Sequence, residues 1–459
     1  MSENVYPRVL IAGVSSGVGK TTISLAVMAA LVKRGLKVQG FKVGPDFIDP
    51  GYYEMVTGRP GRNLDSWMVG QENTKSCFLH ASMGTDISVI EGVMGLYDGK
   101  DGLDLGSSAE IAKLIECPVI LVIDGAKIGG SAGAIALGYV KYDESLNIAG
   151  FIVNNVGSNR HESMIRTAIE KATGLPVFGC VKRNARIQIS ERHLGLLTQI
   201  EKGNDTEFAD LLAEIAVEYI DVDGLLKLAR LSSKPLLCRN DMFRQTDSLA
   251  KVRIGVAYDK AFSFYYYDNF DLLEAAGAKI IFFSPIKDEQ IPEGIDGLYI
   301  GGGYPEVYAN DLQQNKEISL AIRKAIEDGM PVYAECGGLM YLAKALEDFD
   351  GMSFEMCGAF PVECKMQKRP TLRYREVVAI SNSVVAIEGD ILKGHEFHYS
   401  SIKNIISNII KPAYRLENGL TEGLIYKNAL ATYIHLNFAS KPGIADRFVE
   451  MCQKGKVLV

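Results

Sequence analysis

Residues 13–21 read G-V-S-S-G-V-G-K-T, and this stretch decides the fold of the first half of the chain. A short β-branched run at 8–12 precedes it and a helical stretch at 20–34 follows it, which predicts a strand, a glycine turn and a helix. In that setting the backbone N–H groups of the turn and of the helix N-terminus form a cradle for phosphate groups. Lys20 is then expected to reach the β- and γ-phosphates, and the Thr21 hydroxyl is expected to bind Mg²⁺.

The loop departs from the usual phosphate-loop spacing. Five residues separate Gly13 from Gly19, where the usual motif has four. The alternative interpretation is a glycine turn between a strand and a helix that binds no nucleotide. Because Gly17, Gly19, Lys20 and Thr21 are all in place, we favour nucleotide binding.

The chain has 459 residues, which is more than one ordinary hydrophobic core accommodates, so two domains are expected. Hydrophobic residues make up 47% and charged residues 23% of the chain, close to the averages of globular proteins. That composition excludes a disordered chain, a coiled coil and a small disulfide-stapled protein. Glycine is in excess, with 46 residues, and glycines gather where the backbone bends sharply or closely approaches a ligand.

The net charge of −7 argues against nucleic acid as the main partner but not against an anionic small molecule. The eight cysteines include no C-x-x-C pair and indicate free thiols in a reducing compartment. The N-terminal residues lack the apolar core of a secretory signal, and the longest apolar runs are too short to span a bilayer. We therefore expect a soluble, cytoplasmic protein without a membrane or nucleic-acid partner.

Short β-branched runs alternate with amphipathic stretches in two parts of the chain, a rhythm that predicts two α/β domains with mostly parallel sheets. The expected strands are 8–12, 37–43, 86–91, 119–124, 148–154, 252–257, 279–283 and 297–300. The expected helices are 20–34, 107–115, 208–220, 222–229 and 267–276. A polar stretch at 232–247 separates the two parts. We place the first domain at 1–230, a linker at 231–250 and the second domain at 251–459.

Carboxylates stand at the predicted carboxyl ends of strands in the first domain. Residues 42–50 read K-V-G-P-D-F-I-D-P, residues 62–65 read R-N-L-D, and residues 91–99 read E-G-V-M-G-L-Y-D-G. Taken alone, each carboxylate is more often a helix cap or a surface charge. Beside a phosphate loop, however, these groups lie where open α/β sheets bind ligands, and Glu91 occupies the usual place of a second Mg²⁺ ligand.

A cysteine in the second domain occupies the turn between a predicted strand and helix. Residues 332–339 read V-Y-A-E-C-G-G-L, the arrangement of a nucleophile elbow with Cys336 in place of serine. The helix N-terminus favours the thiolate at this point. The three glycines at 301–303 offer backbone N–H groups for an oxyanion, and His435 is the expected base for Cys336. The alternative is a buried cysteine that only fills the core.

Each half resembles a known kind of domain. The first, with its longer loop gap, resembles dethiobiotin synthetase and its relatives, which are P-loop proteins that activate a carboxylate with ATP. The second resembles class I glutamine amidotransferase domains, which carry His-x-Glu where this chain has His435 and Asn437, so the group that orients His435 stays open. Residues 394–400, G-H-E-F-H-Y-S, resemble the amidases of the cobalamin pathway. We interpret His395 and His398 as structural or substrate-facing rather than as metal ligands.

Together, and in this order, the two halves resemble the cobyrinate a,c-diamide synthase family over nearly the whole chain. The shared motifs include R-H-L-G-L at 192–196, whereas Arg373 stands where the family usually has glycine. The resemblance implies an α/β protein with a P-loop parallel-sheet domain and a class I glutamine amidotransferase-like domain. It implies a carbon–nitrogen ligase that uses ATP, Mg²⁺ and L-glutamine to amidate the a and c acetate groups of a tetrapyrrole polycarboxylate through an acyl phosphate. A protected route for ammonia between the domains is expected, and a homodimer stays open.

The resemblance also implies roles for individual residues. Cys336 and His435 are expected to hydrolyse glutamine. Asp46 and Asp98 are expected to position or polarise the substrate acid and ammonia. The expected Mg²⁺ ligands are Thr21, Asp65 and Glu91. The residues expected at the nucleotide are Gly17, Gly19, Lys20, Thr21, Thr22, Lys42 and Asn154, with Lys42 offsetting charge on the acyl phosphate and Asn154 reading adenine. Those expected at the oxyanion are Gly302, Gly303 and Gly337.

Three alternatives stay open at this point. The nearest is the same chemistry on nickel-sirohydrochlorin, as in methanogens. Cobyric acid synthase, which amidates other side chains, fits the acidic segments less well. A P-loop regulatory ATPase with an inactive amidotransferase module is a different class of protein, and the intact pair of Cys336 and His435 argues against it. The substrate's metal, the order of amidation and the oligomeric state are not determined by the sequence.

Overall fold

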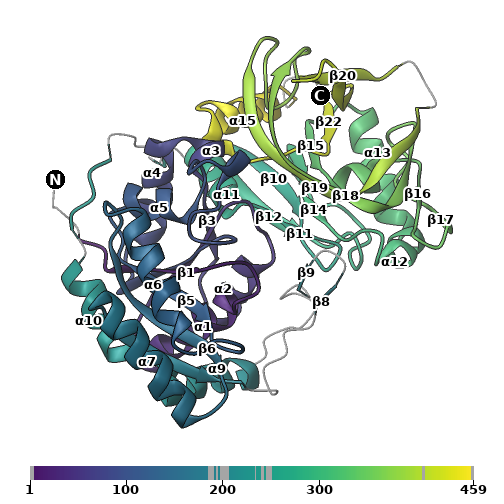
Figure 1. Cartoon of the computed structure of the whole chain (residues 1–459). Coiled ribbons are helices and arrows are strands. Elements are labelled where there is room, and N and C mark those ends of the chain that lie inside the picture. Colours follow the sequence, from purple (N-terminus) through teal and green to yellow (C-terminus); the bar gives the residue numbers. More distant parts are fainter. Residues whose placement is uncertain are drawn as a thin grey trace. The chain divides into compact units, whose positions relative to one another are not determined.

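The structure is a computed structural model of the chain, which divides into two compact units, Met1–Asn240 and Asp241–Val459 (Figure 1). The described residues are 5–183, 191–192, 195–196, 206–232, 234–238, 242–243, 251–405 and 409–455. Much of the predicted linker at 231–250 and part of the motif at 192–196 lie outside the described residues, so the predicted domain bounds stay a prediction. Within the described part of the chain, no helix has the length and apolar character needed to cross a membrane.

The first unit is built on a seven-stranded parallel sheet with the order β3-β2-β4-β1-β5-β6-β7. The strands are β1 (Arg8–Gly13), β2 (Val38–Val43), β3 (Arg62–Leu64), β4 (Ile87–Glu91), β5 (Val119–Asp124), β6 (Ile148–Val156) and β7 (Val177–Lys182). Successive side chains of β1 point to opposite faces, so Val9 and Ile11 join one apolar core while Leu10 and Ala12 join another. Burial on both faces explains why these strands are continuous apolar runs.

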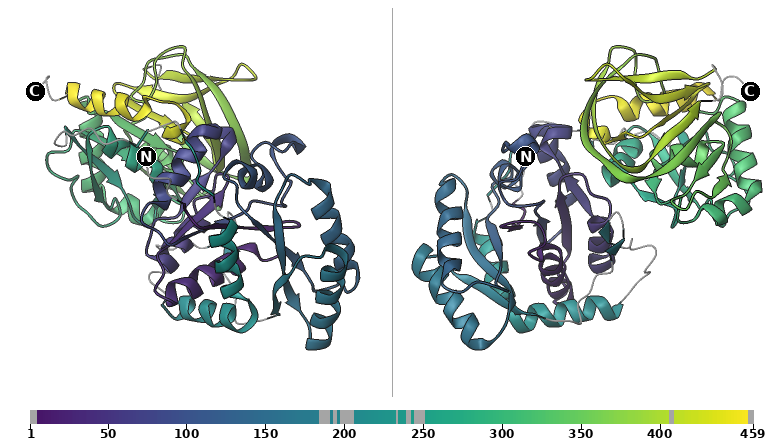
Figure 2. Two further views of the ribbon diagram at one scale, coloured as in Figure 1. Left: turned by 90° about the vertical axis from the view of Figure 1, so that its left-hand side faces the viewer. Right: turned by 45° about the vertical axis from the view of Figure 1, so that its right-hand side comes forward.

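Helices cover both faces of this sheet (Figures 1 and 2). The core that contains Val9 includes residues from α1 (Lys20–Lys33), α2 (Asp49–Thr57), α9 (Thr206–Tyr219) and α10 (Val222–Ser232). The opposite core includes residues from α4 (Gln71–Ser82), α5 (Ser108–Leu114), α6 (Ser131–Tyr142) and α7 (Asn159–Thr173). Because α1 begins directly after the glycine turn, the phosphate loop lies at the carboxyl end of β1, in the middle of the sheet.

The second unit is built on a twelve-stranded mixed sheet. Its parallel part has the order β12-β10-β13-β15-β22, and the mostly antiparallel remainder continues from β22 through β21, β20, β18, β16 and β17. The parallel strands are β10 (Val252–Ala257), β12 (Ala278–Phe283), β13 (Gly297–Ile300), β15 (Val332–Glu335) and β22 (Ala429–Thr432). The others on this path are β16 (Ala345–Glu347), β17 (Ser353–Glu355), β18 (Val362–Ala379), β20 (Lys411–Leu416) and β21 (Thr421–Tyr426). The helices of this unit include α11 (Tyr267–Ala275), α12 (Ala309–Gln314), α13 (Lys316–Glu327), α14 (Gly337–Leu342) and α15 (Ile444–Gly455).

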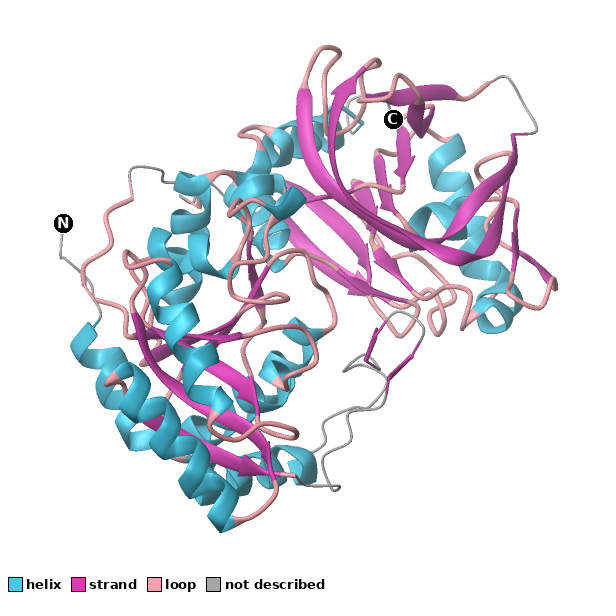
Figure 3. Cartoon of the chain, in the orientation of Figure 1, coloured by secondary structure: helices cyan, strands magenta, loops and turns pink. Residues whose placement is uncertain are grey.

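A long antiparallel hairpin extends this sheet (Figure 3). It consists of β18 and β19 (Ile391–Ile405), and β19 also pairs with the short strand β23 (His435–Leu436). The register places His395 opposite His435. The hairpin therefore brings the motif at 394–400 to the predicted catalytic histidine.

The predicted fold class is confirmed, and the predicted strands and helices agree with the observed elements to within three residues. The β18–β19 hairpin was not predicted. Its first strand contains the polar run K-M-Q-K-R-P-T-L-R, whose side chains are mostly exposed, so the apolar alternation that marks a buried strand is missing there.

Arg8 begins β1 and is fully buried, with its guanidinium donating to three backbone carbonyls. Nε donates to Ile115 at 2.6 Å, Nη1 to Tyr6 at 2.9 Å and Nη2 to Lys234 at 3.1 Å. Burial lowers the pKa of Arg8 from its usual value. This side chain therefore ties the start of the central strand to the end of α5 and to the segment at 234–238.

We expect Arg8→Ala to lower the free energy of unfolding of the first unit by about 3 kcal/mol, because one buried and two part-buried carbonyls lose their donor. Trp67 is the chain's single tryptophan and is buried in the first unit, so its fluorescence during urea unfolding reports that unit. The control is Lys33→Ala, which removes an exposed ion pair to Asp210 and is expected to change the free energy by less than about 1 kcal/mol. Equal unfolding midpoints for the two variants would contradict the structural role of Arg8.

Candidate active sites

The phosphate loop joins β1 to α1 and depends on two glycines with left-handed backbone. Gly17 has φ +77°, and Gly19, the residue before α1, has φ +94°. A Cβ atom on Gly19 would lie 2.1 Å from Nδ2 of Asn154, so this close approach requires glycine. Asn154 Nδ2 donates to the carbonyl of Val18 at 3.0 Å and thereby holds the loop against β6. The structure thus shows Asn154 supporting the loop, and its predicted contact with adenine stays a prediction.

Lys20 is the first residue of α1 and folds back over the loop. Its Nζ donates to the carbonyl oxygens of Ser15 at 2.9 Å and Met94 at 2.5 Å. Burial lowers the pKa of Lys20, and the positive charge of Lys42 lowers it further. An ammonium group held by two carbonyls beside a glycine turn can exchange them for phosphate oxygens, which bind it more strongly because they are charged. Thr22 follows in α1 and is half-buried.

Glu91 ends β4 and is fully buried, yet its carboxylate accepts from three donors. Oε1 accepts from the Thr21 hydroxyl at 2.6 Å and from Lys42 Nζ at 2.8 Å, and Oε2 accepts from the Tyr53 hydroxyl at 2.7 Å. The sheet order explains this meeting, because β4 lies between β1 and β2 and the register pairs Lys42 with Glu91. Burial raises the pKa of Glu91, whereas the Lys42 charge and the Thr21 hydroxyl act in the opposite direction.

Two residues of this cluster were missed by the sequence analysis. Lys42 Nζ contacts Asp49 Oδ2 at 2.5 Å. Burial alone would lower the pKa of Lys42, but the carboxylates of Asp49 and Glu91 raise it on balance, so the ammonium stays charged. Asp49 stands in the quoted motif at 42–50 but had no role assigned, and Tyr53 was not singled out. Their spacing of four residues on α2, which puts both on one face of that helix, was the available signal.

Two further predicted carboxylates of the first unit, Asp46 and Asp98, accept hydrogen bonds from backbone N–H groups. Asp46 Oδ1 accepts from Ile48 at 2.8 Å and from Asp49 at 3.1 Å, at the start of α2. Burial and the negative charge of Asp49 raise the pKa of Asp46 to about 7. Asp98 Oδ2 accepts from the N–H of Gly95 at 2.8 Å. A Cβ atom on Gly95 would lie 3.1 Å from the carbonyl of Val14, so the loop that carries Asp98 lies directly against the phosphate loop.

Cys336 lies between β15 and α14 with φ +48° and ψ −98°, a strained backbone for a residue other than glycine. Its N–H donates to the carbonyl of Thr432 at 2.7 Å, and its Sγ lies 3.9 Å from the carbonyl oxygen of Phe397. Burial raises the pKa of the Cys336 thiol, and the charge of Glu306 raises it further. A buried thiol of this kind needs a base that accepts its proton before it can act as a nucleophile.

The predicted oxyanion glycines lie together beside this elbow. Gly302–Gly303 forms β14, which pairs with β11 (Phe262–Phe264). A Cβ atom on Gly337 would lie 3.0 Å from the backbone nitrogen of Gly303. A Cβ atom on Gly302 would lie 2.5 Å from Cε1 and 3.3 Å from Nε2 of His435. The structure therefore brings the three glycines and the predicted base to one place, where an added Cβ atom would clash at Gly302 and Gly303 and would be tightly packed at Gly337.

His435 is buried, with only 1% of its surface exposed. Its ring stacks on the ring of His395, with centroids 5.0 Å apart and an angle of 20° between the planes. Its Nδ1 lies 3.6 Å from Oε2 of Glu335, the residue directly before Cys336. Asn437, at the position where the resemblance leads one to expect an acid, instead accepts from the N–H of Ala439 at 2.9 Å and caps a short turn.

The remaining residues that the sequence analysis singled out in the second unit are His395, His398 and Arg373, and both histidines contact neighbouring side chains or backbone. His398 Nδ1 lies 2.8 Å from the carbonyl of Ser400, and its ring stacks on Tyr433 with centroids 4.0 Å apart. His395 Nδ1 lies 3.0 Å from the Tyr266 hydroxyl. Burial lowers the pKa of both His395 and His398, so both rings are neutral at pH 7. Arg373 is exposed on β18.

Comparison with known proteins assigns both halves of the chain. Residues 9–197 match the CobQ/CobB/MinD/ParA nucleotide binding domain, and residues 253–443 match the CobB/CobQ-like glutamine amidotransferase domain. The cobyrinate a,c-diamide synthase of Picrophilus torridus is 46% identical, over 97% of this chain and 98% of its own length. The protein of the same name from Dehalococcoides mccartyi strain 195 is 45% identical over the same shares of the two chains.

The chain belongs to the cobyrinate a,c-diamide synthase family. The predicted resemblance is thereby confirmed. A further relative, the hydrogenobyrinate a,c-diamide synthase of Streptomyces coelicolor, is 39% identical over 98% of this chain and 99% of its own length. Relatives of this chain are thus named for cobyrinate and for hydrogenobyrinate.

The first-unit cluster of this family member offers oxygen donors of the kind that Mg²⁺ prefers. The Thr21 hydroxyl and a Glu91 carboxylate oxygen are already 2.6 Å apart, and one or two such groups together with nucleotide phosphates make up the usual Mg²⁺ site. Asp65, the third predicted ligand, is buried and accepts from the N–H of Met68 at 2.9 Å as the cap of α3 (Ser66–Val69). Among the described residues there is no group of three or more His, Cys, Asp or Glu side chains that could hold a metal ion by themselves.

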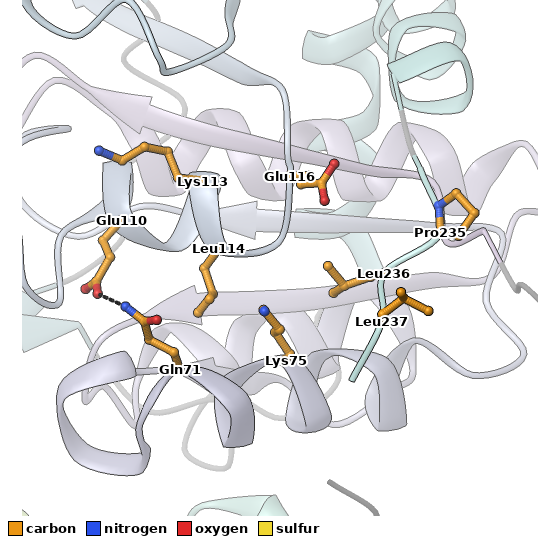
Figure 4. A pocket seen from close by; sticks show the side chains of 9 residues that line it. All are labelled: Gln71, Lys75, Glu110, Lys113, Leu114, Glu116, Pro235, Leu236 and Leu237. Atoms are coloured by element: carbon orange, nitrogen blue, oxygen red, sulfur yellow. Dashed lines mark hydrogen bonds between the residues drawn. The ribbon is translucent and has the colours of Figure 1, made fainter. Parts of the chain in front are cut away.

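A separate hollow of about 560 Å³ lies in the first unit beside α4, α5 and the segment at 234–238 (Figure 4). Its lining includes Gln71 and Glu110, which share a hydrogen bond of 3.2 Å, together with Lys75, Lys113 and Leu236. None of the predicted site residues lines this hollow, so its shape does not bear on the chemistry of the phosphate loop.

We expect Gly19→Ala to raise the Kd for Mg²⁺-ATP by at least about tenfold, because the new Cβ would push the Asn154 amide away from the Val18 carbonyl and so remove a contact that holds the loop. The matched control is Gly35→Ala, at φ +80° with no atom within 4 Å of the added Cβ. It carries the same left-handed backbone strain of about 1–2 kcal/mol but lies beyond the far end of α1, so its Kd stays within about twofold of wild type. Isothermal titration calorimetry with a non-hydrolysable ATP analogue measures both. Equal affinities for the two variants would contradict nucleotide binding at this loop.

Proposed function

We propose that the chain amidates the a and c acetate side chains of cobyrinate, with glutamine as the nitrogen donor and ATP as the source of energy. The observation that carries this proposal is that one chain, similar over 97% of its length to synthases of that name, holds two separate clusters of polar residues. One cluster is the elbow at Cys336 together with the buried His435. The other is the phosphate loop, after which the Thr21 hydroxyl donates a hydrogen bond to Glu91. The first site suits release of ammonia, and the second suits activation of a carboxylate.

Glutamine hydrolysis begins at the elbow. His435 takes the proton of the Cys336 thiol, and the sulfur attacks the carboxamide carbon of glutamine. Backbone N–H groups of Gly303 and Gly337 stabilise the oxyanion of the tetrahedral intermediate. The carbon–nitrogen bond then breaks, His435 returns the proton to the leaving nitrogen, and ammonia departs. Water, deprotonated by His435, hydrolyses the thioester to give glutamate and the free thiol.

Carboxylate activation takes place at the phosphate loop. A carboxylate oxygen of the substrate attacks the γ-phosphorus of ATP, ADP leaves, and an acyl phosphate results. The ammonium groups of Lys20 and Lys42 offset the negative charge that builds up on the phosphoryl oxygens. Thr21 and Glu91 would hold Mg²⁺, which supplies further positive charge to the phosphates when it is bound. Ammonia then attacks the acyl carbon, phosphate leaves, and Asp46 or Asp98 accepts the surplus proton.

We expect the wild-type chain to convert cobyrinate into a product two amidations heavier, with ATP, Mg²⁺ and glutamine. Cys336→Ala removes the nucleophile, so glutamine-driven product falls to background while ammonium chloride still drives both amidations. Mass spectrometry of the products measures this, with hydrogenobyrinate and nickel-sirohydrochlorin as parallel substrates. Amidation of only one of the parallel substrates would reassign the substrate, and no ATP-dependent amide on any tetrapyrrole would contradict the proposal.

The pKa of Asp46, raised to about 7, predicts the pH dependence of the ammonia-driven reaction. Below pH 7 the carboxyl is protonated and cannot accept a proton from attacking ammonia, so the rate at constant free ammonia rises as the pH increases from 6 to 8. Asp46→Asn abolishes this rise and lowers the rate at pH 8 by about 10²-fold. Asp86→Asn, which changes an exposed carboxylate at the opposite end of β4, keeps the wild-type profile. A rising profile that persists in Asp46→Asn would show that another group carries the proton.

A further inference from the structure

Glu335 is a buried carboxylate of the second unit that the mechanism above does not use. It ends β15, directly before Cys336, and only 1% of its surface is exposed. A carboxylate at this depth is costly unless it is paired or hydrogen-bonded. Its charge also raises the pKa of the neighbouring thiol, which by itself opposes nucleophilic attack. A residue with both disadvantages needs a compensating interaction.

Three donors hold the Glu335 carboxylate in one orientation. The Tyr333 hydroxyl donates to Oε1 at 2.5 Å and the Tyr299 hydroxyl donates to Oε2 at 3.1 Å. The backbone N–H of Leu436 donates to Oε1 at 2.9 Å. Asn269 braces this arrangement, because its Nδ2 donates both to the Tyr299 hydroxyl at 3.2 Å and to the Leu436 carbonyl at 2.9 Å. The carboxylate is therefore fixed relative to the backbone that carries His435.

The same carboxylate faces one edge of the His435 ring. Oε2 lies 3.6 Å from Nδ1, which is longer than a hydrogen bond but close enough for the carboxylate to attract the ring once the ring is protonated. The opposite edge of the ring, Cε1 and Nε2, lies against Gly302 in the predicted oxyanion group. His395 stacks on the ring at 5.0 Å and restricts its rotation. The ring therefore has a carboxylate on its Nδ1 side and the reaction site on its Nε2 side.

We propose that Glu335 is the positioning residue of the glutaminase site, an inference that rests on the proposed hydrolysis of glutamine by Cys336 and His435. With a proton on Nδ1 directed at Glu335, Nε2 keeps the lone pair that accepts the thiol proton, and the carboxylate stabilises the imidazolium that forms. Asn437, which follows His435 by two residues, is occupied as a turn cap and does not take this role. The acid that is missing after the histidine is thus supplied from the strand before the cysteine.

The test compares Glu335→Gln with wild type in two assays on the full chain. A carboxamide oxygen in the place of Oε1 still accepts from the Tyr333 hydroxyl and the Leu436 N–H, and the amide nitrogen then faces the Tyr299 hydroxyl, but the charge that supports the imidazolium is gone. Glutamine hydrolysis is expected to lose about 10–10³-fold in kcat/KM, and the alkaline limb of its pH profile is expected to move to lower pH. Ammonia-driven amidation, which needs no glutaminase chemistry, stays within about twofold and shows that the variant is folded.

Glu422→Gln is the matched control. Glu422 is a buried carboxyl in the same sheet whose pKa is raised to about 7 by burial, and it accepts from the Thr432 hydroxyl at 2.6 Å and from the Tyr433 N–H at 2.7 Å. Replacement of the Glu422 carboxyl by an amide is expected to leave the alkaline limb of the pH profile of glutamine hydrolysis unchanged. If Glu335→Gln loses both activities, Glu335→Asp is used in its place. Because this variant keeps the negative charge, the alkaline limb of the pH profile is expected to stay at its wild-type position even if the rate of glutamine hydrolysis falls.

A double-mutant cycle with His435→Ala completes the test, because a residue that acts through His435 has no further effect once the ring is absent. The inference is overturned if glutamine hydrolysis is unchanged in Glu335→Gln, or if hydrolysis falls while the alkaline limb of the pH profile stays in place. It is also overturned if Glu422→Gln moves the alkaline limb equally, or if Glu335→Gln lowers hydrolysis by the same factor in the His435→Ala background. Absence of glutamine hydrolysis in the wild-type chain would instead refute the proposed function itself.

Discussion

The buried carboxylate of Glu91 is the interaction on which the active arrangement of the first unit depends. Burial of an unpaired carboxylate is costly, and here three donors from three different elements offset that cost. Thr21 comes from the start of α1, directly after the phosphate loop, Lys42 from β2 and Tyr53 from α2, so the single carboxylate links the nucleotide loop to the acidic motif. The strand order makes this possible, because β4 lies directly between the strands that carry its partners. Any shift of register between β4 and β2 would separate Lys42 from Glu91 and leave both charges buried without a partner.

The second unit also contains a buried carboxylate at the end of a strand, and this carboxylate lies at the second candidate site. A strand again ends in a buried carboxylate, Glu335, and hydroxyl and backbone donors again fix its direction. The next residue, Cys336, has a strained left-handed backbone, which persists only because the surrounding packing leaves no alternative. Gly303 packs closely against this turn, since a Cβ atom on Gly337 would lie 3.0 Å from the Gly303 nitrogen. Pairing between β19 and β23 then sets the place of His435. The end of β15 thus positions both Glu335 and Cys336, and β23 positions His435.

Local patterns were sufficient to predict the phosphate loop, Cys336 and His435, because each lies in a short motif whose geometry is determined by neighbouring residues. Local patterns were insufficient to predict residues that come into contact only after the strands have paired into a sheet. Asp49 and Tyr53 reach the Lys42–Glu91 pair because α2 turns one face toward β2, a fact that depends on tertiary packing. Glu335 stood within a quoted motif, but its proximity to His435 arises from a pairing one hundred residues along the chain. Asp65 was predicted as a metal ligand from resemblance, and that role stays a prediction; the structure shows Asp65 as the cap of α3.

The central claim is that one unit releases ammonia and the other activates a carboxylate by transfer of the γ-phosphoryl group. The most direct measurement uses cobyrinate whose carboxylate oxygens carry ¹⁸O, incubated with ATP, Mg²⁺ and glutamine, followed by mass spectrometry of the inorganic phosphate. We expect one labelled oxygen to appear in phosphate for each amide formed, because the acyl phosphate breaks between carbon and oxygen when ammonia attacks. Amide formation with unlabelled phosphate, or with the label in AMP, would contradict phosphoryl transfer to the substrate.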